Sequence, residues 1–350
     1  MSPPSLNELL KQTSRSFYLT LRVLPGAICP QIGLAYLLAR TADTIADTEI
    51  VPVAQRLAAL QKLRERILGS SRAALPLGEL AKHQGSPAER GLLERVEEAL
   101  AALGELTPED LTLVRQVLDT ITSGQELDLR RFEEGSEPAG EPTSGTARED
   151  DRPGARKIGA LQNVAELDDY TYRVAGCVGE FWTEMCRRHL FPEASLDTAG
   201  FLANGIRFGK GLQLVNILRD IPADLRKGRC YLPADALAQA GLTPADLMVP
   251  ANEVKFRPLY HGYLDLAEAH LAAGWEYTNT IPRHHVRVRL ACAWPILIGV
   301  KTIERLREAA VLDPAQRVKI SRAEVRSILV RSVLRYPGRE SWRRLATFSR

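Results

Sequence analysis

Apolar residues recur at three- and four-residue intervals along most of this chain. That spacing places them on one face of a helix with 3.6 residues per turn. It predicts helices over residues 31–46, 53–68, 89–103, 108–129, 205–219 and 259–273. Runs of alternating β-branched residues, which are typical of strands, are nearly absent. The pattern therefore predicts an all-α protein.

One segment, 133–157, departs from the helical pattern. It is rich in Gly, Pro, Glu, Ser and Arg and has almost no large apolar side chain. Such a composition suits a surface loop or an interdomain linker, because it offers little apolar surface to bury. We expect a flexible loop within a single all-α domain over residues 1–350, because the helices on either side of it carry related chemistry.

The C-terminal segment, 321–350, is strongly basic, with eight arginines against two glutamates. Four apolar residues are interleaved with these charges: Val325, Ile328, Leu329 and Val333. The alternation predicts an amphipathic helix with a cationic face. A solvated helix face is the plainer interpretation of this pattern, and weak attraction to an anionic lipid surface is the functional one.

Composition excludes several classes of protein. With 350 residues, 45% hydrophobic and 25% charged, the chain is neither disordered nor collagen-like. A formal net charge of +3 gives no reason to expect a nucleic-acid partner. Five cysteines without a CxxC spacing indicate reduced thiols in the cytosol. The most apolar window, 290–300, is about half the ~20 residues that span a bilayer. We therefore expect a cytoplasmic protein, at most peripheral at the inner membrane.

Two short segments share one cluster of charged residues. Each has two aspartates four residues apart and an arginine upstream: Arg40, Asp43 and Asp47, then Arg219, Asp220 and Asp224. Residues four apart lie on one face of a helix, so each pair directs two carboxylates to the same point. Exposed acids at this spacing are common, but both pairs here lie in otherwise apolar helices. Carboxylates suit Mg²⁺, which shares its ligand shell with substrate phosphates, so the pairs predict a Mg²⁺–diphosphate site.

Other polar residues near the acid pairs complete this predicted site. Ser14, Arg15 and Ser16 offer hydroxyl donors and a guanidinium group, and Arg229 follows the second pair. Arginine binds phosphate through two parallel hydrogen bonds and keeps its charge, which suits a departing diphosphate. Gln213 and Asn216 are three residues apart and would share a helix face with Asp220. No HExxH, P-loop or GxSxG motif indicates a different chemistry.

Four segments, in this order, resemble motifs of the squalene and phytoene synthases. They read TSRSF at 13–17, YLLARTADTIAD at 36–47, YTYRVAGCVG at 170–179, and QLVNILRDIPAD at 213–224 followed by GRCYLP at 228–233. The similarity covers roughly residues 6–322. It implies the isoprenoid synthase fold, with helices around a central cavity, acid pairs at its mouth and an apolar tunnel beneath. Members of the family condense two prenyl diphosphates head to head through a cyclopropyl intermediate.

The resemblance also implies roles for individual residues. The Mg²⁺ ligands would be Asp43, Asp47, Asn216, Asp220 and Asp224. The diphosphate contacts would be Ser14, Arg15, Ser16, Arg40, Gln213, Arg219 and Arg229. Tyr170 matches a tyrosine implicated in proton transfer or carbocation stabilisation, Tyr36 lines the same region, and Tyr172 is the reserve candidate for the role of Tyr170. Packing in the core is the alternative interpretation of these tyrosines.

Within the family, the first two motifs look closer to the squalene type. We therefore expect a squalene synthase, a farnesyl-diphosphate farnesyltransferase that requires Mg²⁺. It would join two farnesyl diphosphates through presqualene diphosphate and reduce the product with NADPH. Lys319 and Arg322 resemble a basic stretch near the NADPH phosphate. Ala46 and Ala223 stand where many squalene synthases carry an additional glutamate. The alternatives are a dehydrosqualene or phytoene synthase, which performs no reduction, and a non-catalytic lipid-binding relative.

Overall fold

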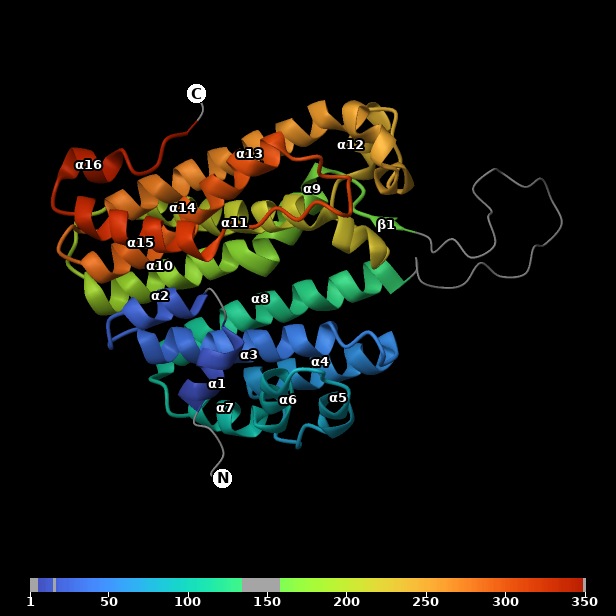
Figure 1. Ribbon diagram of the computed structural model, residues 1–350. Coiled ribbons are helices and arrows are strands. Elements are labelled where there is room, and N and C mark those ends of the chain that lie inside the picture. Colours follow the sequence, from blue (N-terminus) through green and yellow to red (C-terminus); the bar gives the residue numbers. More distant parts are fainter. Residues whose placement is uncertain (1–5, 15–16, 134–157, 349–350) are drawn as a thin grey trace.

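The computed structural model describes residues 6–14, 17–133 and 158–348, which fold into two stacked groups of helices (Figure 1). The first group comprises α1 (Leu6–Thr13), α2 (Phe17–Val23), α3 (Cys29–Ala46), α4 (Val53–Leu68), α5 (Gly78–Lys82), α6 (Pro87–Glu94), α7 (Val96–Leu103) and α8 (Pro108–Glu133). The second comprises α9 (Val164–Thr171), the π-helical turn η1 (Tyr172–Gly176), α10 (Cys177–Leu190), α11 (Thr198–Arg226), α12 (Ala234–Gln239), the 3₁₀ turns η2 (Ala245–Met248) and η3 (Pro250–Asn252), α13 (Glu253–Thr280), α14 (Val286–Glu308), α15 (Arg322–Arg335) and α16 (Arg339–Arg343).

The all-α prediction is confirmed for these residues. Their strands are two residues long, β1 (Gly159–Ala160) and β2 (Arg229–Cys230), and pair in parallel. This pairing holds Arg229 directly after the second acid pair. The predicted loop at 133–157 lies outside the described residues, apart from its first residue, which ends α8. Among the described helices, none is both long and apolar enough to cross a membrane.

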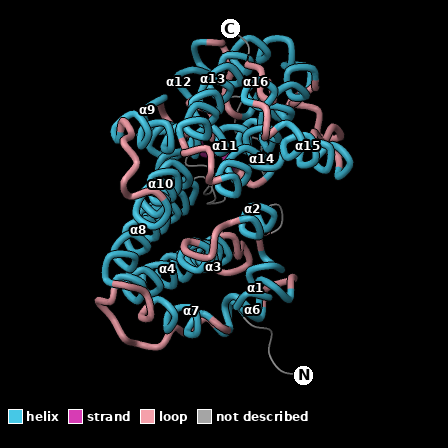
Figure 2. The backbone as a smooth tube through the Cα atoms, turned by 90° about the vertical axis from the view of Figure 1, so that its left-hand side faces the viewer, coloured by secondary structure: helices cyan, strands magenta, loops and turns pink. Residues whose placement is uncertain are grey.

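Two hydrophobic clusters fill the interior, and the first draws on both groups of helices, because α10 and parts of α11, α13 and α14 contribute to it. One buried cluster fills the space between α1, α3, α4, α6, α7, α8 and α10, and the other fills the space between α11, α13, α14 and α15. Seen from the side, the two groups lie one above the other, with α8 and α10 at one edge and α2 at the opposite edge (Figure 2). Phe208 of α11 packs against both clusters. The region between the groups is therefore enclosed by helices from both.

The helices α10 and α11 approach one another so closely that only glycine fits at their contacts. A Cβ atom on Gly179 would lie 1.9 Å from the carbonyl oxygen of Gly205. One on Gly209 would lie 2.1 Å from the carbonyl oxygen of Ala175, in η1. Both distances are far inside van der Waals contact. Backbone-to-backbone packing therefore sets the spacing of these two helices, and η1 is a π-helical insertion of the kind often found at functional sites.

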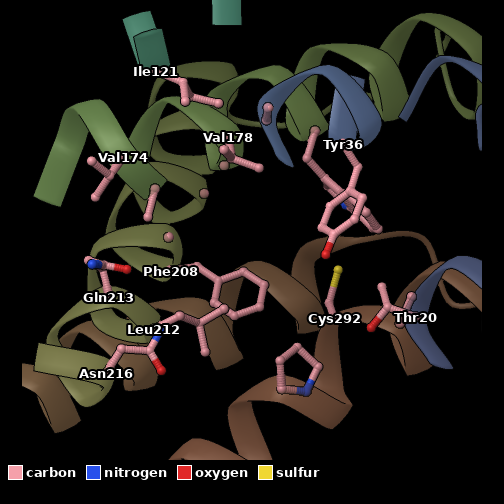
Figure 3. A pocket seen from close by; sticks show the side chains of 18 of the residues that line it. Thr20, Tyr36, Ile121, Val174, Val178, Phe208, Leu212, Gln213, Asn216 and Cys292 are labelled. Carbon is pink, nitrogen blue, oxygen red and sulfur yellow. The ribbon is translucent and has the colours of Figure 1, made fainter. Parts of the chain in front are cut away.

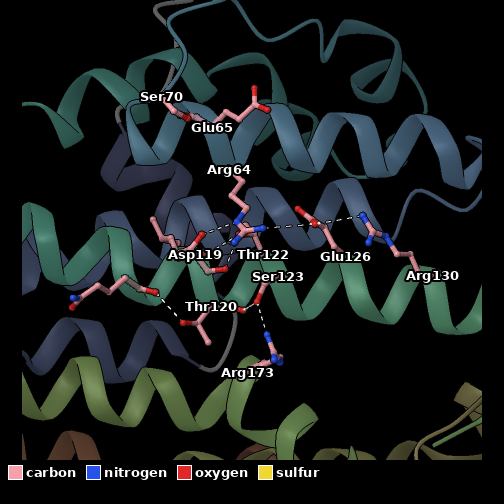
Figure 4. A network of polar contacts seen from close by, with 12 residues as sticks. Arg64, Glu65, Ser70, Asp119, Thr120, Thr122, Ser123, Glu126, Arg130 and Arg173 are labelled. Atoms are coloured by element: carbon pink, nitrogen blue, oxygen red, sulfur yellow. Dashed lines mark hydrogen bonds and ion pairs between the residues drawn. The ribbon is translucent and has the colours of Figure 1, made fainter.

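Hydrogen bonds hold helix α8 against its neighbours on both sides (Figure 4). Toward α4, Arg64 Nε donates a hydrogen bond to Asp119 Oδ1 over 2.6 Å. Toward η1, Arg173 Nη1 donates to Ser123 Oγ over 3.0 Å. Because α8 is held between its neighbours, the polar residues of its last turns occupy fixed positions beside the first acid pair.

Two helix predictions need correction. The helix expected over 89–103 is two helices, α6 and α7, because Arg95 leaves the helical region with a φ of −113°. No glycine or proline marks that break, so the sequence offers no signal for it. The amphipathic helix expected within 321–350 ends at Arg335, because Pro337 and Gly338 interrupt it before α16 begins. Val333, expected on its apolar face, is 51% exposed.

Candidate active site

A cavity of about 400 Å³ lies between the two groups of helices (Figure 3). Of the residues that the motifs single out, Tyr36 and Asp43 of α3 and Gln213 and Asn216 of α11 line it. Figure 3 shows Tyr36 on one side of the cavity and Gln213 and Asn216 on the other. The first and second acid motifs therefore contribute to opposite walls of one cavity, although about 170 residues separate them in the sequence.

The interior of this cavity is largely apolar. Its lining includes Trp182 of α10, Phe208 and Leu212 of α11, and Ala291 and Cys292 of α14. The glycines of the α10–α11 contact also line it, which lets the cavity reach the backbone of both helices. Such a lining offers few groups that could hold water, so a hydrocarbon chain would be shielded from solvent there.

The first acid pair sits at the end of α3. The backbone N–H of Asp47 donates to the carbonyl oxygen of Asp43 over 2.8 Å, so helical geometry extends to Asp47 and keeps both acids on one face. Arg40 Nη1 lies 3.6 Å from Asp43 Oδ2, and its Nη2 donates to Glu89 over 2.7 Å. Gln125 Nε2 of α8 donates to Asp43 Oδ1. The first pair is thus anchored by neighbours from α3, α6 and α8.

The second acid pair lies in the last turns of α11, which continues as a helix through Pro222. Arg219 binds Asp220 with two hydrogen bonds, of 2.9 and 2.6 Å. Just beyond the pair, Lys227 Nζ lies 3.5 Å from Oε1 of Glu49, which follows the first pair. This ion pair joins the chain segments that follow the two motifs. Of the four aspartates, Asp43 alone is among the residues that line the cavity, whereas Asp220 lines a neighbouring cleft.

Three carboxyl groups of this region have raised pKa values. Burial and the negative charge of Asp47 raise the pKa of Asp43 to about 6. Burial and the charge of Asp220 raise the pKa of Asp224 to about 7. Burial raises the pKa of Asp128, on α8, to about 6. Each shift means that negative charge is unfavourable there in the protein alone, and a bound cation would relieve it.

The residues at the cavity mouth fit a magnesium ion that is shared with a substrate. Within the described ranges, no three acid, histidine or cysteine side chains converge on one point as a complete metal cage. Mg²⁺ does not require one, because it keeps several waters and takes further ligands from phosphates. Two buried oxygen atoms beside the acids, Gln125 Oε1 and Asp128 Oδ1, have no hydrogen-bond partner. These oxygens and the raised pKa values are what a missing cation would leave behind.

The structure places the three candidate tyrosines differently. Tyr36 lines the cavity, and its hydroxyl donates to the carbonyl oxygen of Thr13 over 3.3 Å. Tyr170 is buried and stacks on Tyr231 with 4.7 Å between ring centroids. Burial, followed by the charge of Asp128, raises the pKa of Tyr170, so its hydroxyl stays protonated. Tyr172 lies outside the cavity lining, and its hydroxyl donates to Glu180 over 2.9 Å.

Sequence reasoning missed three polar residues of this region: Gln125, Asp128 and Tyr231. Tyr231 donates a hydrogen bond to Asp128 Oδ2 over 2.8 Å, and it lies against Tyr170. The sequence carried part of the signal, since Gln125 and Asp128 are three apart on α8 and share a face. What it lacked was any indication that this face meets the first acid pair.

The remaining predicted diphosphate contacts are only partly described. Ser14 is 2% exposed, and its Oγ is buried without a hydrogen-bond partner. Arg15 and Ser16 lie outside the described residues. Arg229 is held by the β1–β2 pairing next to Asp128, whose pKa its charge lowers in part.

The structure does not bring the two predicted NADPH contacts, Lys319 and Arg322, into one lining. Lys319 lines a cleft of about 420 Å³ on the outer side of the second acid motif, together with Arg219, Arg226 and Arg317. Arg322, at the start of α15, is not part of that lining. A cleft with four cationic side chains fits a ligand that carries phosphates, so its residues are compatible with NADPH.

Comparisons with known proteins agree with this geometry. The squalene/phytoene synthase family model matches residues 10–324. The chain is 30% identical over 268 residues to a bifunctional lycopene cyclase/phytoene synthase of Gibberella fujikuroi, covering 74% of this chain and 40% of that protein. It is 28% identical over 319 residues to the presqualene diphosphate synthase of Rhodopseudomonas palustris, covering 90% of this chain and 91% of that protein.

Among solved structures, TcSQS in complex with the ligand E5700 superposes with a TM-score of 0.72 at 21% sequence identity. The match covers 93% of this chain and 84% of that one, which confirms the all-α isoprenoid synthase fold. The chain spans about two fifths of the length of the bifunctional relative. Because the family model covers most of its residues, the chain belongs to the squalene/phytoene synthase family, whose members are prenyltransferases that condense prenyl units head to head.

Proposed function

We propose that this protein is a squalene synthase. It joins two molecules of farnesyl diphosphate through presqualene diphosphate and reduces this intermediate with NADPH to squalene, with the whole chain acting as one catalytic domain. One observation carries the proposal: the two acid motifs contribute polar residues, Asp43 from one and Gln213 and Asn216 from the other, to the walls of one cavity whose interior is largely apolar. Substrates that join a diphosphate to a long hydrocarbon need both environments in one site.

The residues at the mouth would bind the diphosphate groups. Asp43, Asp47, Asp220, Asp224 and Asn216 would hold Mg²⁺, which offsets the negative charge of the leaving diphosphate. Arg40, Arg219 and Arg229, with Ser14, Arg15, Ser16 and Gln213, would donate hydrogen bonds to its oxygens. In the structure, Arg40 and Arg219 are paired with acids. A bound cation would therefore free these guanidinium groups to turn toward phosphate.

The cavity would protect the carbocation that forms when the carbon–oxygen bond to the diphosphate breaks. Water would capture that cation, and the apolar lining from α10, α11 and α14 keeps water away. Tyr170 would serve beside the acids as a neutral hydrogen-bond donor, because its raised pKa keeps the hydroxyl proton in place. Tyr36 would contact the chain of the substrate within the cavity. Tyr172 remains the reserve for the role of Tyr170, although it lies outside the lining.

The NADPH step has a candidate location in the cleft lined by Lys319. This cleft shares Arg219 and Asp220 with the second acid motif, so a phosphate-bearing cofactor bound there would lie next to the condensation site. Arg322 would contact it from outside the lining. A Lys319→Gln variant should raise the KM for NADPH without changing the rate of presqualene diphosphate formation. An equal loss in both steps would argue against this assignment.

Product analysis tests the whole proposal. Purified protein is incubated with farnesyl diphosphate and Mg²⁺, with and without NADPH, and the hydrocarbons are identified by gas chromatography and mass spectrometry. Squalene that forms only with NADPH supports the proposal. Dehydrosqualene formed regardless of NADPH, or activity only with the C20 donor, would replace it by a dehydrosqualene or phytoene synthase.

A second candidate is an enzyme that stops at presqualene diphosphate. The observation in its favour is the Rhodopseudomonas palustris relative of that name, which aligns along nine tenths of both chains. The same incubation distinguishes it, because presqualene diphosphate would then accumulate whether or not NADPH is present.

We also propose a peripheral contact between α15 and an anionic membrane. Val330, Val333 and Leu334 are 52%, 51% and 72% exposed on this helix. Exposed arginines accompany them: Arg326, Arg331 and Arg335. Apolar side chains flanked by cations are the signature of helices that lie in the headgroup region. In co-sedimentation with phosphatidylglycerol vesicles, Leu334→Glu should reduce binding, whereas Val254→Glu, which replaces an exposed valine on α13, should not.

A further inference from the structure

A second pocket, of about 460 Å³, lies where α13 and α14 are joined. Tyr277 of α13 and Cys292 of α14 line the cavity. Asn279 of α13 and Arg289 of α14 line the second pocket, whose outer wall is formed by α16. No residue is shared between the two linings. The proposed function assigns nothing to this place.

The lining of this pocket is strongly basic. Four arginines contribute to it: Arg283, Arg289, Arg339 and Arg343. Among the parts of the chain that the structure describes, none of the four forms an ion pair with a carboxylate. Glu340 also lines the pocket, but it is paired with Arg344. The pocket therefore carries an excess of positive charge that the protein itself does not neutralise. We name it the arginine pocket.

Arg289 is the unusual member of the set, because it is only 6% exposed. Its Nη2 donates to Asn279 Oδ1 over 2.7 Å, and its Nε is buried without a partner. The guanidinium lies 5.7 Å from the ring centre of Tyr336 and 5.4 Å from that of Trp342. Aromatic faces offset part of the cost of a buried charge. Arginines are nonetheless almost never this buried without an anionic partner.

The charge on Arg289 is unfavourable in the protein alone. Burial lowers the pKa of its guanidinium, and the positive charges of Arg283 and Arg343 lower it further, against an opposing contribution from Tyr336. An anion in the pocket would offset both the burial of Arg289 and the charges of its two arginine neighbours. The acid pairs show the opposite shift, because burial and like charges there raise the pKa values of carboxyl groups.

Hydrogen bonds within the protein hold the walls of the pocket in place. Tyr336 donates its hydroxyl to the carbonyl oxygen of Arg283 over 2.5 Å, and Arg283 Nη2 donates to the carbonyl oxygen of Tyr336 over 3.1 Å. Trp342 Nε1 donates to Asn279 Oδ1 over 2.9 Å, and the Trp342 ring stacks on Trp275. A pocket whose walls are fixed in advance loses little conformational entropy on binding.

We propose that the arginine pocket binds an anionic ligand that carries phosphate groups. Guanidinium groups bind phosphate oxygens in pairs, and several converging arginines favour a diphosphate over a single carboxylate. The volume lies within the range of ordinary small-ligand sites. A soluble diphosphate and the headgroup of an anionic lipid share this chemistry. The inference stands independently of the reaction that the cavity catalyses.

The test measures binding of inorganic diphosphate by calorimetry in buffer with EDTA, where the metal-dependent site is disabled. Arg343→Gln should weaken binding about tenfold, because it removes one charge-assisted contact. Arg72→Gln is the control: it removes the same charge from an exposed arginine that lines no part of the pocket. Arg339→Gln repeats the test from the first turn of α16, and thermal unfolding verifies that each variant is folded.

A parallel arm distinguishes the two sources of phosphate by co-sedimentation with phosphatidylglycerol vesicles. A loss of diphosphate binding in Arg343→Gln but not in Arg72→Gln supports a soluble ligand. A loss confined to vesicle binding, with the same contrast between the two variants, supports a lipid headgroup. If Arg343→Gln and Arg339→Gln behave like Arg72→Gln in both assays, the arginine pocket is not a phosphate site and the inference is overturned.

Discussion

The mouth of the cavity and the arginine pocket carry opposite charges that the protein leaves uncompensated. At the mouth, the pKa values of Asp43, Asp128 and Asp224 are raised, which marks an excess of negative charge. In the arginine pocket, the pKa of Arg289 is lowered, which marks an excess of positive charge. The direction of a pKa shift thus indicates the sign of the partner that each site favours. The mouth favours a cation, and the arginine pocket favours an anion.

The two regions are also built differently. The acid pairs project from the ends of long helices, α3 and α11, that run through the middle of the molecule. The arginine pocket is assembled from the end of α13, the beginning of α14 and the short helix α16. Substitutions that disturb helix spacing should therefore damage the cavity and leave the arginine pocket intact. Four predictions test this comparison, beginning with the largest expected effect.

Removal of one carboxylate charge from either acid pair should abolish most of the activity. Asp43→Asn and Asp220→Asn should each lower turnover of farnesyl diphosphate by about 100-fold or more at saturating Mg²⁺, because an amide binds the ion far less well. Asp265→Asn is the control, since Asp265 is an exposed acid on α13 paired with Arg307. Wild-type turnover in either acid-pair variant would contradict the metal assignment.

Separation of α10 from α11 should damage the cavity alone. Gly179→Ala places a Cβ atom 1.9 Å from the Gly205 carbonyl oxygen, so the helices must move apart. We expect a loss of about 1–3 kcal/mol in unfolding free energy, measured by urea denaturation, together with loss of condensation. Gly262→Ala, at a site with nothing within 4 Å, should instead gain up to about 1 kcal/mol from helix propensity. Comparable losses in both variants would show that the α10–α11 contact is not special.

Metal binding should depend on pH with a definite sign. The pKa of Asp224 is about 7 in the folded protein against an ordinary 3.8, so between these values the folded state holds a proton that the unfolded chain has released. Stability in EDTA should therefore fall as the pH rises from about 4 to about 7. Mg²⁺ must displace this proton, so its affinity should rise up to about tenfold per pH unit below pH 7 and then level off.

Thermal unfolding with and without Mg²⁺, measured from pH 5 to pH 8, checks both trends. Asp224→Asn carries no titrating group at this position, so it should reduce the slope of the profile of the metal-free protein, to which Asp43 and Asp128 still contribute. A stability in EDTA that increases over this pH range would contradict the assigned direction. Arg343→Gln should leave this stability profile unchanged, because none of the three acids with raised pKa values lines the arginine pocket.

The smallest effect is expected at Tyr231. Tyr231→Phe keeps the stacking on Tyr170 but removes the hydrogen bond to Asp128, leaving a buried carboxyl group without its donor. Activity should fall a few-fold. Tyr260→Phe removes a comparable buried hydrogen bond, which goes to the backbone carbonyl oxygen of Leu218 and not to a carboxyl group. Tyr260→Phe should lower the free energy of unfolding by about as much as Tyr231→Phe does and leave the turnover number unchanged. A few-fold loss of turnover in both variants would show that Tyr231 contributes through packing alone.

Periodicity and spacing along the chain by themselves determine much of this molecule. The boundaries of α4 match the prediction, and α3, α8, α11 and α13 each contain a predicted helix. The shared face of Asp43 and Asp47 also follows from the sequence, because helical geometry is a local property of the backbone. Two predicted helix boundaries were wrong for local reasons. At Arg95 the sequence gives no sign that the helix breaks, whereas at Pro337 the proline itself indicates the end of the helix.

Only the tertiary structure decided which faces meet. Gln125 reaches Asp43 across 82 positions, and Tyr231 reaches Asp128 across 103. The arginine pocket joins residues from 279–289 with residues from 336–343, and none of its members stands out in the sequence. The order of residues within a helix determines which side chains lie on each of its faces. The packing of α10 on α11, α13 on α14 and α16 on both determines which of those faces share a cavity, since contacts between distant segments leave no trace in local periodicity.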